Sequence, residues 1–442
     1  MTRNERFGIA LLCLTITASR GVAQRQGETR ALASRVDALV SPEAAANRLS
    51  GIMLIARGDR VVLQRTWGFA DWERRVPVSS STRIGIGSIT KNMTQMVLEQ
   101  LVAEGRIDIN APASKYLPGF PDGPGGGHAT IQQLLVHRSG VPWRVTGALD
   151  ETEPLSPADV VERVKAKGLL FEPGTQELYS SAGYTALARI VEVIEGKPFD
   201  DVLAQRIFRP ASMTSATGET GERLMPDRAL PYILGAGATR TAVFSASYKN
   251  LGFLTGAGSV YASAADMLHF VRALRAGTFG SAASHEQLGD PADTTWSSWY
   301  GRTNGYESSV DYLPAQDLTF VFLSNLRSAA NWQLRIQVRN ILRGRAVTPL
   351  ASVPAVVASF ESPVSIVGPY DDAPDSIVIS HADGRLFRDG DDIYPIAGGW
   401  YYSPASSQTM RFARDAAGAV DSMVTLYPWS GKERMMRRLG PR

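Results

Sequence analysis

The sequence predicts an α+β protein in which an antiparallel sheet is flanked by helices, followed by a small all-β domain. Strand-like runs stand near the start of the chain and again after residue 296, with helical patterns between them. Beyond residue 363, short alternating runs separated by tight turns replace the helical patterns. With 442 residues, of which 44% are hydrophobic, the chain is long enough to bury one large core and a smaller second one.

The first 23 residues have the pattern of a secretory signal peptide. Two arginines precede an apolar run over residues 7–14, and Gly21-Val22-Ala23 offers small residues for cleavage. Because the apolar run is too short for a stable anchor, we expect cleavage after Ala23 and no stable membrane insertion. The mature protein is then expected to be periplasmic or secreted. Cys13, the only cysteine, leaves with this segment, so we expect no disulfide in the mature chain.

Charge and histidine spacing argue against two kinds of partner. The formal net charge is +3, and residues 1–23 carry a net +2 of it, whereas a nucleic-acid binder shows a basic surplus or stripe. The five histidines, at positions 128, 137, 269, 285 and 381, form no His-x-x-x-His or similar metal-ligand spacing. We therefore expect no nucleic-acid partner, no metal site and no cofactor.

The amino-terminal elements lead to a serine at the start of a helix. Residues 28–48 carry a helical apolar stripe, and residues 51–56 and 60–67 are β-rich runs that predict a hairpin. Ser88 then stands at the start of a predicted helix, and Lys91 is the third residue after it. That position normally carries Glu or Gln, because a negative group suits the positive end of a helix. Either the lysine bends into solvent, or the site needs an amine one turn from a hydroxyl, and we interpret Ser88 as a nucleophile.

The pattern Ser-x-x-Lys is a weak signal by itself, and the competing signature of a nucleophilic serine is Gly-x-Ser-x-Gly. Gly-x-Ser-x-Gly does not occur in the sequence, which argues against an α/β-hydrolase.

The Gly- and Pro-rich residues 118–127 predict a loop in a place suited to the border of a cleft. Residues 130–140 resemble a short helix, and we interpret His137 near its end as a structural residue outside the site.

The second half of the main domain carries two further informative stretches. Tyr179-Ser180-Ser181 precedes a predicted helix, and taken alone Tyr179 is typical of a core aromatic. Residues 210–260 predict no clear element. Residues 296–309 and 318–323 resemble adjacent strands, and Trp299-Tyr300-Gly301 marks either an aromatic strand or close approach by a ligand. Predicted helices cover residues 156–167, 263–277 and 332–342. The predicted signal peptide spans residues 1–23 and is followed by a main domain over 24–350. A linker over 351–363 begins the β domain, which spans 351–442.

Three stretches in this order, Ser88-Ile89-Thr90-Lys91, Tyr179-Ser180-Ser181 and Trp299-Tyr300-Gly301, make residues 30–345 resemble the serine β-lactamase and penicillin-binding-protein superfamily. The resemblance is to the class C branch, which includes class C β-lactamases, D-alanyl-D-alanine carboxypeptidases, D-aminopeptidases and family VIII esterases. It implies an inserted helical subdomain, Ser88 as the acylated nucleophile, Lys91 as its activating amine and Tyr179 as the general base. It also implies an oxyanion hole formed by the backbone N–H groups of Ser88 and Arg302.

Two departures from the family pattern bear on the substrate. The second motif usually ends in Asn, which meets the acyl amide of a β-lactam or peptide, and here that residue is Ser181. The third motif of β-lactamases begins with Lys, which attracts the substrate carboxylate, and here that residue is Trp299, as in some family VIII esterases. The resemblance therefore implies an uncharged, partly apolar substrate that contacts Ser181, Trp299 and Gly301, while strand alternation turns the Arg302 side chain out of the cleft.

The leading interpretation is an extracytoplasmic serine hydrolase that forms an acyl-Ser88 intermediate, with small acyl esters as its expected substrates. A D-amino-acid peptidase or amidase, with β-lactam hydrolysis as a side activity, is the nearest alternative, so the expected partner is a small-molecule ester, amide or peptide. A non-catalytic ligand-binding relative is the third. Residues 368–370 and 437–439 resemble the lipocalin-like β domain that follows some members of the family, and its role stays open.

Overall fold

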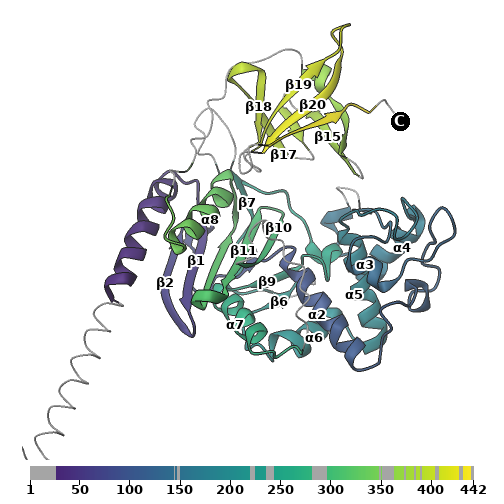
Figure 1. The fold of residues 1–442 in the computed structure, drawn as a ribbon, viewed down its shortest axis with the longest axis horizontal. Helices are drawn as coiled ribbons and strands as arrows, with labels where there is room; N and C mark the ends of the chain where they lie inside the picture. The colour runs from purple at the N-terminus through teal and green to yellow at the C-terminus, as the bar shows by residue number, and fades with distance from the viewer. Residues whose placement is uncertain are drawn as a thin grey trace, which may run out of the picture.

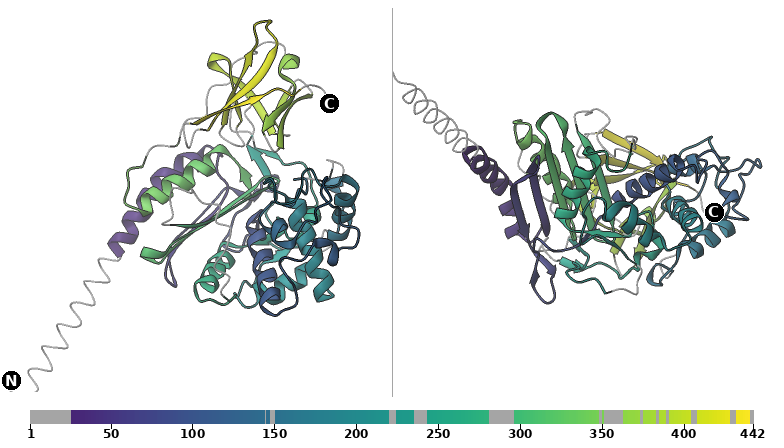
Figure 2. Two further views of the ribbon diagram at one scale, coloured as in Figure 1. Left: turned by 45° about the vertical axis from the view of Figure 1, so that its right-hand side comes forward. Right: turned by 90° about the horizontal axis from the view of Figure 1, so that it is seen from below.

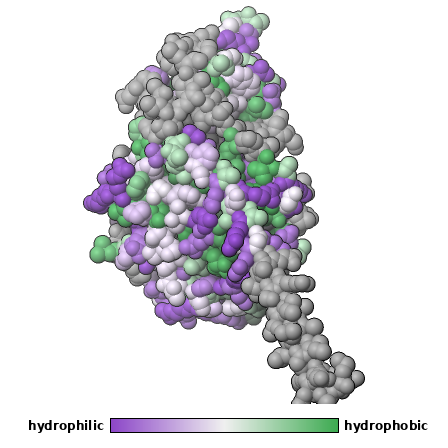
Figure 3. All heavy atoms as spheres, turned by 90° about the vertical axis from the view of Figure 1, so that its left-hand side faces the viewer, coloured by the Kyte–Doolittle hydropathy of each residue, from purple (hydrophilic) through white to green (hydrophobic). Residues whose placement is uncertain are grey.

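The computed structural model describes residues 26–143, 145–146, 150–219, 224–234, 243–280, 296–347, 350, 363–372, 375–382, 385–388, 391–403, 408–427 and 432–439. The predicted signal peptide, its cleavage site and the linker up to residue 362 lie outside these ranges, so the predicted domain boundaries stay predictions. Within these ranges, no helix is both long and apolar enough to cross a bilayer. Hydrophilic and hydrophobic side chains are interspersed over the face seen in Figure 3.

A five-stranded antiparallel sheet forms the centre of the main unit, as predicted. Its order is β10-β11-β12-β1-β2, with β1 at Gly51–Arg57, β2 at Arg60–Trp67, β10 at Ser297–Thr303, β11 at Tyr306–Leu313 and β12 at Leu318–Ser324. The first and last of these segments meet in the sheet, because Gly51 of β1 lies opposite Ser324 of β12. β10 is an edge strand. Short strands elsewhere are β3 at Phe69–Asp71, β4 at Val76–Pro77, β5 at Ile84–Gly85, β6 at Thr217–Gly218, β7 at Tyr232–Leu234, β8 at Val243–Ser245, β9 at Val260–Ala262 and β13 at Leu326–Arg327.

Helices cover both faces of this sheet (Figures 1 and 2). One helix spans residues 26–45, and the others are α2 at Ile89–Ala103, α3 at Ile131–Leu135, α4 at Pro157–Lys167, α5 at Ser181–Glu195, α6 at Phe199–Leu203, α7 at Ala264–Arg275 and α8 at Ala329–Leu342. The first helix and α8 lie side by side on one face, where Met53 and Ile55 of β1 join their core. On the other face, Ile52 and Leu54 join the larger core built with α2, α5 and α7. Alternate residues of β1 are thus buried on opposite faces, which explains its continuous apolar sequence.

The helical group α3, α4 and α5 lies beyond α2 and is inserted in the chain between β5 and β9 (Figure 1). This confirms the expected inserted helical subdomain. The helix predicted over residues 130–140 is shorter, because His137 adopts a left-handed backbone with φ 58°, which cannot continue a helix. The strand predicted over residues 296–309 is a hairpin, because Asn304 and Gly305 have positive φ values of 34° and 86° and form a tight turn.

The carboxy-terminal unit is an eight-stranded up-and-down near-barrel, which confirms the predicted small all-β domain. Its strands are β14 at Gly368–Asp372, β15 at Asp375–Ala382, β16 at Arg385–Arg388, β17 at Asp391–Ile396, β18 at Trp400–Ser403, β19 at Gln408–Arg414, β20 at Val420–Tyr427 and β21 at Lys432–Arg437. A bridge between Tyr370 and Arg438 brings the last strand beside the first. Met410 and Met423, both 0% exposed, help to fill the interior with side chains.

Candidate active site

Ser88 lies where a short strand turns into a helix. β5 ends at Gly85, Gly87 adopts a positive φ of 53°, and α2 begins at Ile89. Ser88 therefore occupies the N-cap position, yet its side chain makes no capping hydrogen bond. Instead, the Tyr179 hydroxyl donates to Ser88 Oγ at 2.8 Å. The hydroxyl of Ser88 thus contacts the Tyr179 hydroxyl and does not cap the start of its own helix.

Lys91 is buried beside this hydroxyl, with 3% of its surface exposed. Its Nζ donates to the Ala257 carbonyl at 2.9 Å and to the hydroxyls of Ser88 and Ser181, each at 3.4 Å. The ammonium also lies 4.7 Å from the centroid of the Tyr179 ring. In the described part of the chain, no carboxylate forms an ion pair with Lys91. The lysine therefore does not bend into solvent, which removes one of the two readings of the Ser-x-x-Lys pattern.

Tyr179 immediately precedes α5, and its neighbours hold it in place. Ser180 caps α5 by accepting the Gly183 N–H at 2.9 Å. The ring of His137 lies with its centroid 4.4 Å from that of Tyr179. Burial, and after it the positive charge of Lys91, lower the pKa of His137 to about 3, so the imidazole is neutral near pH 7. The sequence predicts that His137 is a structural residue outside the site, whereas in the structure its ring packs against the expected base.

The backbone of β10 passes directly over the Ser88 turn. A Cβ atom at Gly301 would lie 1.9 Å from the Ile86 carbonyl oxygen and 2.8 Å from the Ser88 nitrogen. A Cβ at Gly87 would lie 2.6 Å from the Arg302 nitrogen. The two glycines thus let the backbone nitrogens of Ser88 and Arg302 approach one another. Backbone N–H groups from two such segments beside a hydroxyl could serve as an oxyanion hole, and this role of Ser88 and Arg302 stays a prediction.

The remaining predicted substrate contacts differ in exposure. Trp299 lies on the same strand face as Gly301 but is only 4% exposed and belongs to the main hydrophobic core. Trp299 is thus almost fully covered by the core, and its predicted contact with substrate stays a prediction. The Arg302 side chain is exposed, as strand alternation predicted. Ser181 is half-buried, and its hydroxyl contacts Lys91.

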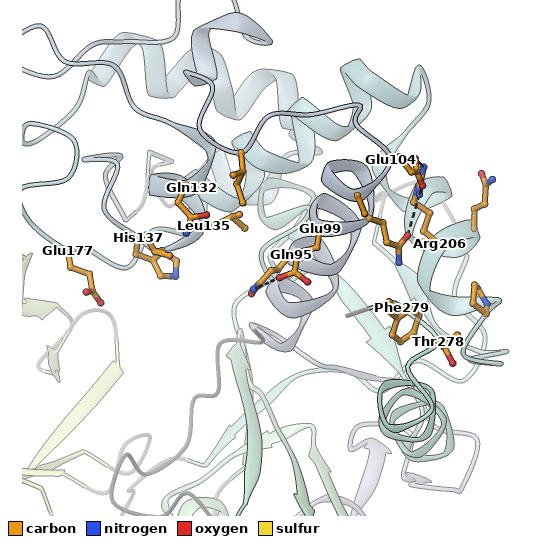
Figure 4. Close-up of a pocket in the computed structure, with 17 residues that line it drawn as sticks. Gln95, Glu99, Glu104, Gln132, Leu135, His137, Glu177, Arg206, Thr278 and Phe279 are labelled. Atoms are coloured by element: carbon orange, nitrogen blue, oxygen red, sulfur yellow. Dashed lines mark hydrogen bonds and ion pairs between the residues drawn. The ribbon is translucent and has the colours of Figure 1, made fainter. Parts of the chain in front are cut away.

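A cavity of about 1370 Å³ opens along α2 beside His137 (Figure 4). Seven of its lining residues carry amide or carboxylate side chains, and Gln95 Nε2 donates to Glu99 Oε1 at 2.9 Å. The lining residues are Gln95, Glu99, Gln100, Ala103, Glu104, Ile109, Gln132, Leu135, Val136, His137, Glu177, Gln205, Arg206, Pro210, Thr278, Phe279 and Gly280. Ser88, Lys91 and Tyr179 are not among them, so the cavity does not contain the predicted catalytic residues, and it reaches their surroundings through His137. Within the described ranges, no group of three His, Cys, Asp or Glu side chains could hold a metal ion.

The Ala257 carbonyl is a further group beside Lys91, and no sequence motif predicts it. Lys91 Nζ donates to it, and Thr94 Oγ1 donates to the neighbouring Gly256 carbonyl at 2.6 Å. Gly256 has a positive φ of 77°, and a Cβ there would lie 2.6 Å from that of Ala188. The segment lies in residues 210–260, for which no element was predicted. Its Gly-Ala-Gly sequence was the available signal of close packing.

Several known proteins are similar to this chain in sequence or in fold. Residues 36–339 match the family model described as Beta-lactamase. The chain is 28% identical over 321 residues to Esterase EstB of Burkholderia gladioli, covering 64% of this chain and 81% of the esterase. It is 30% identical over 252 residues to PbpX of Bacillus subtilis, covering 57% of this chain and 61% of that relative. The crystal structure of D-amino acid amidase from Ochrobactrum anthropi shares the fold, with a TM-score of 0.59, 20% identity and coverage of 71% of this chain and 99% of the amidase.

Proposed function

The chain belongs to the Beta-lactamase family, and from that premise we propose that it is a serine hydrolase that forms an acyl-Ser88 intermediate. One observation carries the proposal: the Tyr179 hydroxyl lies 2.8 Å from Ser88 Oγ. The buried Lys91 amine lies 3.4 Å from the same oxygen. A hydroxyl with a potential base within hydrogen-bond reach is the arrangement of an activated nucleophile.

In the proposed reaction, Ser88 Oγ attacks the ester carbonyl carbon and its proton passes to the Tyr179 oxygen. Tyr179 acts as a base when the Tyr179–Lys91 pair has lost one proton. The N–H groups of Ser88 and Arg302 stabilise the oxyanion. The bond to the leaving oxygen then breaks, and Tyr179 returns the proton to it, releasing the alcohol. Water repeats the sequence on acyl-Ser88, which releases the acid and restores the serine.

We propose small, uncharged acyl esters as the substrate class. Trp299 stands where the third motif of β-lactamases begins with a lysine. An indole cannot attract a carboxylate as that lysine does. Ser181 contacts Lys91 through its only polar side-chain group, a hydroxyl. It therefore lacks the separate carbonyl acceptor and NH₂ donor that an asparagine amide would offer. A D-amino-acid amidase or peptidase is the second candidate, which the likeness of fold to the Ochrobactrum amidase favours.

Replacing Trp299 by lysine should shift this preference toward charged substrates. We expect the wild-type kcat/KM to be much higher for a short acyl ester than for a cephalosporin, and Trp299→Lys to narrow the ratio roughly tenfold, or about 1.4 kcal/mol. The gain stays this small because the new ammonium must be desolvated in the apolar surroundings of Trp299. Trp299→Met, which removes the indole without adding charge, should leave the ratio nearly unchanged. Efficient cephalosporin hydrolysis by the wild type would overturn the esterase proposal, and preference for a D-alanyl peptide would favour the second candidate.

We also propose that the protein is exported, on the pattern of residues 1–23. The native protein should then begin at Gln24 and contain no cysteine. Amino-terminal sequencing of protein purified from its natural source measures this directly. An intact first residue on that protein would contradict the proposal.

A further inference from the structure

His137 contacts the chain on both sides of Tyr179. Its backbone carbonyl accepts the Leu178 N–H at 2.8 Å, and its ring Nδ1 accepts the Ser180 N–H at 3.1 Å. Leu178 and Ser180 are the two chain neighbours of Tyr179. A single residue therefore fixes the backbone immediately before and immediately after the expected base.

The ring of His137 also limits the side chain of Tyr179. The two ring centroids are 4.4 Å apart with the planes tilted by 40°, and His137 is 4% exposed. Its other aromatic neighbour is Tyr184, at 5.2 Å, whose hydroxyl donates to the Leu135 carbonyl at 3.0 Å. Aromatic pairs at such distances attract one another beyond simple burial. The tyrosine ring is thereby packed against a buried and anchored neighbour.

The backbone of His137 takes the shape that both contacts need. Its φ of 58° lies in the left-handed region, which residues other than glycine adopt at a cost. This conformation ends α3 and turns both the carbonyl and the ring toward residues 178–180. The strain is therefore located at a residue that contacts both neighbours of Tyr179.

Charge supports the same arrangement. Because Nδ1 accepts a hydrogen bond, the proton of the neutral ring lies on Nε2. A protonated ring would lose this acceptor and would place a second positive charge close to Lys91. The lowered pKa of His137, which is about 3, keeps the acceptor available at neutral pH.

We propose that His137 is a positioning residue that holds the Tyr179 hydroxyl within reach of Ser88 Oγ. It acts through Tyr179, so the inference rests on the proposed role of Tyr179 as general base. A displacement of about 1 Å in a catalytic group can cost about 10²-fold in rate, which sets the scale of the expected effect.

A double-mutant cycle tests this role. His137→Ala should lower kcat for a short acyl ester about 10²-fold while KM changes less than about threefold. Tyr179→Phe should lower kcat by roughly 10²–10⁴. In the Tyr179→Phe background, His137→Ala should then lower kcat by less than about threefold, because the group it positions is gone. An equal loss in both backgrounds would show a general structural role and overturn the proposal.

Two further variants make the test robust. His137→Asn tolerates a left-handed backbone and keeps an acceptor near the Nδ1 position, so it should recover part of kcat. If His137→Ala does not fold, His137→Asn replaces it in the cycle, with a smaller loss expected in the wild-type background only. Ile131→Val, at the buried opposite end of α3, should leave kcat unchanged. Ester turnover that survives Ser88→Ala would refute the proposed function itself. If Ser88→Ala abolishes turnover but His137→Ala lowers kcat equally in the wild-type and Tyr179→Phe backgrounds, only the role of His137 is refuted.

Discussion

Ser88→Ala should abolish ester turnover and labelling by a serine-directed fluorophosphonate. The proposed chemistry proceeds through one oxygen, and removing the nucleophile of a cooperating set typically costs roughly 10⁴–10⁶ in kcat. The fold should tolerate the change, because the Ser88 side chain makes no capping hydrogen bond to α2. Hydrolysis of a chromogenic short acyl ester and gel-based labelling measure the two losses.

Ser156 provides a matched control for this substitution. It also stands at a helix start, and its hydroxyl does cap α4 by accepting the Asp159 N–H at 3.3 Å. Ser156→Ala should therefore lower the free energy of unfolding by about 1 kcal/mol and leave turnover unchanged. Ser88→Ala should show the reverse pattern. Labelling or turnover that survives Ser88→Ala would place the nucleophile elsewhere.

Gly301→Ala should also lower the activity strongly. The new methyl group would lie 1.9 Å from the Ile86 oxygen and 2.8 Å from the Ser88 nitrogen, and both are backbone atoms that cannot rotate away. The edge strand β10 must then move away from the Ser88 turn, which separates the N–H groups of Ser88 and Arg302. Loss of an oxyanion-hole donor typically costs roughly 10²–10³ in kcat, and we expect a loss of this size.

Gly258→Ala is the corresponding control. It lies near the same turn, but the closest atom to a new Cβ, Leu254 Cδ1, is 3.5 Å away, which is an ordinary contact distance. Its activity should stay within about threefold of the wild type, because no backbone has to move. Steady-state kinetics of both variants on one ester make the comparison. If Gly301→Ala retained activity at that level as well, β10 would not contribute to the oxyanion hole.

The sequence was sufficient to predict the grouping of Ser88, Lys91 and Tyr179, because each lies in a short motif of the family. It could not separate a purely structural histidine from one that packs against the proposed base, Tyr179. His137 and Tyr179 are 42 positions apart in the chain, and only the tertiary fold brings their rings within 4.4 Å. The Ala257 carbonyl was missed for a related reason, since any residue can supply a backbone acceptor to Lys91.

Burial across the sheet was also beyond a local pattern. The alternation along β10 placed Trp299 and Gly301 on one face, but how much of the indole is covered depends on α2 and the main core. The hairpin at Asn304-Gly305, by contrast, has a clear local signal, since an Asn-Gly pair favours a tight turn over the continuous strand predicted for residues 296–309. Closure of the carboxy-terminal near-barrel depends on the bridge between Tyr370 and Arg438, a long-range pairing that periodicity cannot specify.

The central claim is that the reaction passes through an acyl group on Ser88, and mass spectrometry of the rapidly quenched protein tests it most directly. The full-length protein is mixed with excess short acyl ester, stopped in acid and analysed intact and after digestion. We predict a mass increase equal to one acyl group, located on the peptide that contains Ser88 and absent from Ser88→Ala. Turnover accompanied by an acyl group on any other residue, with the Ser88 peptide unmodified, would contradict the claim.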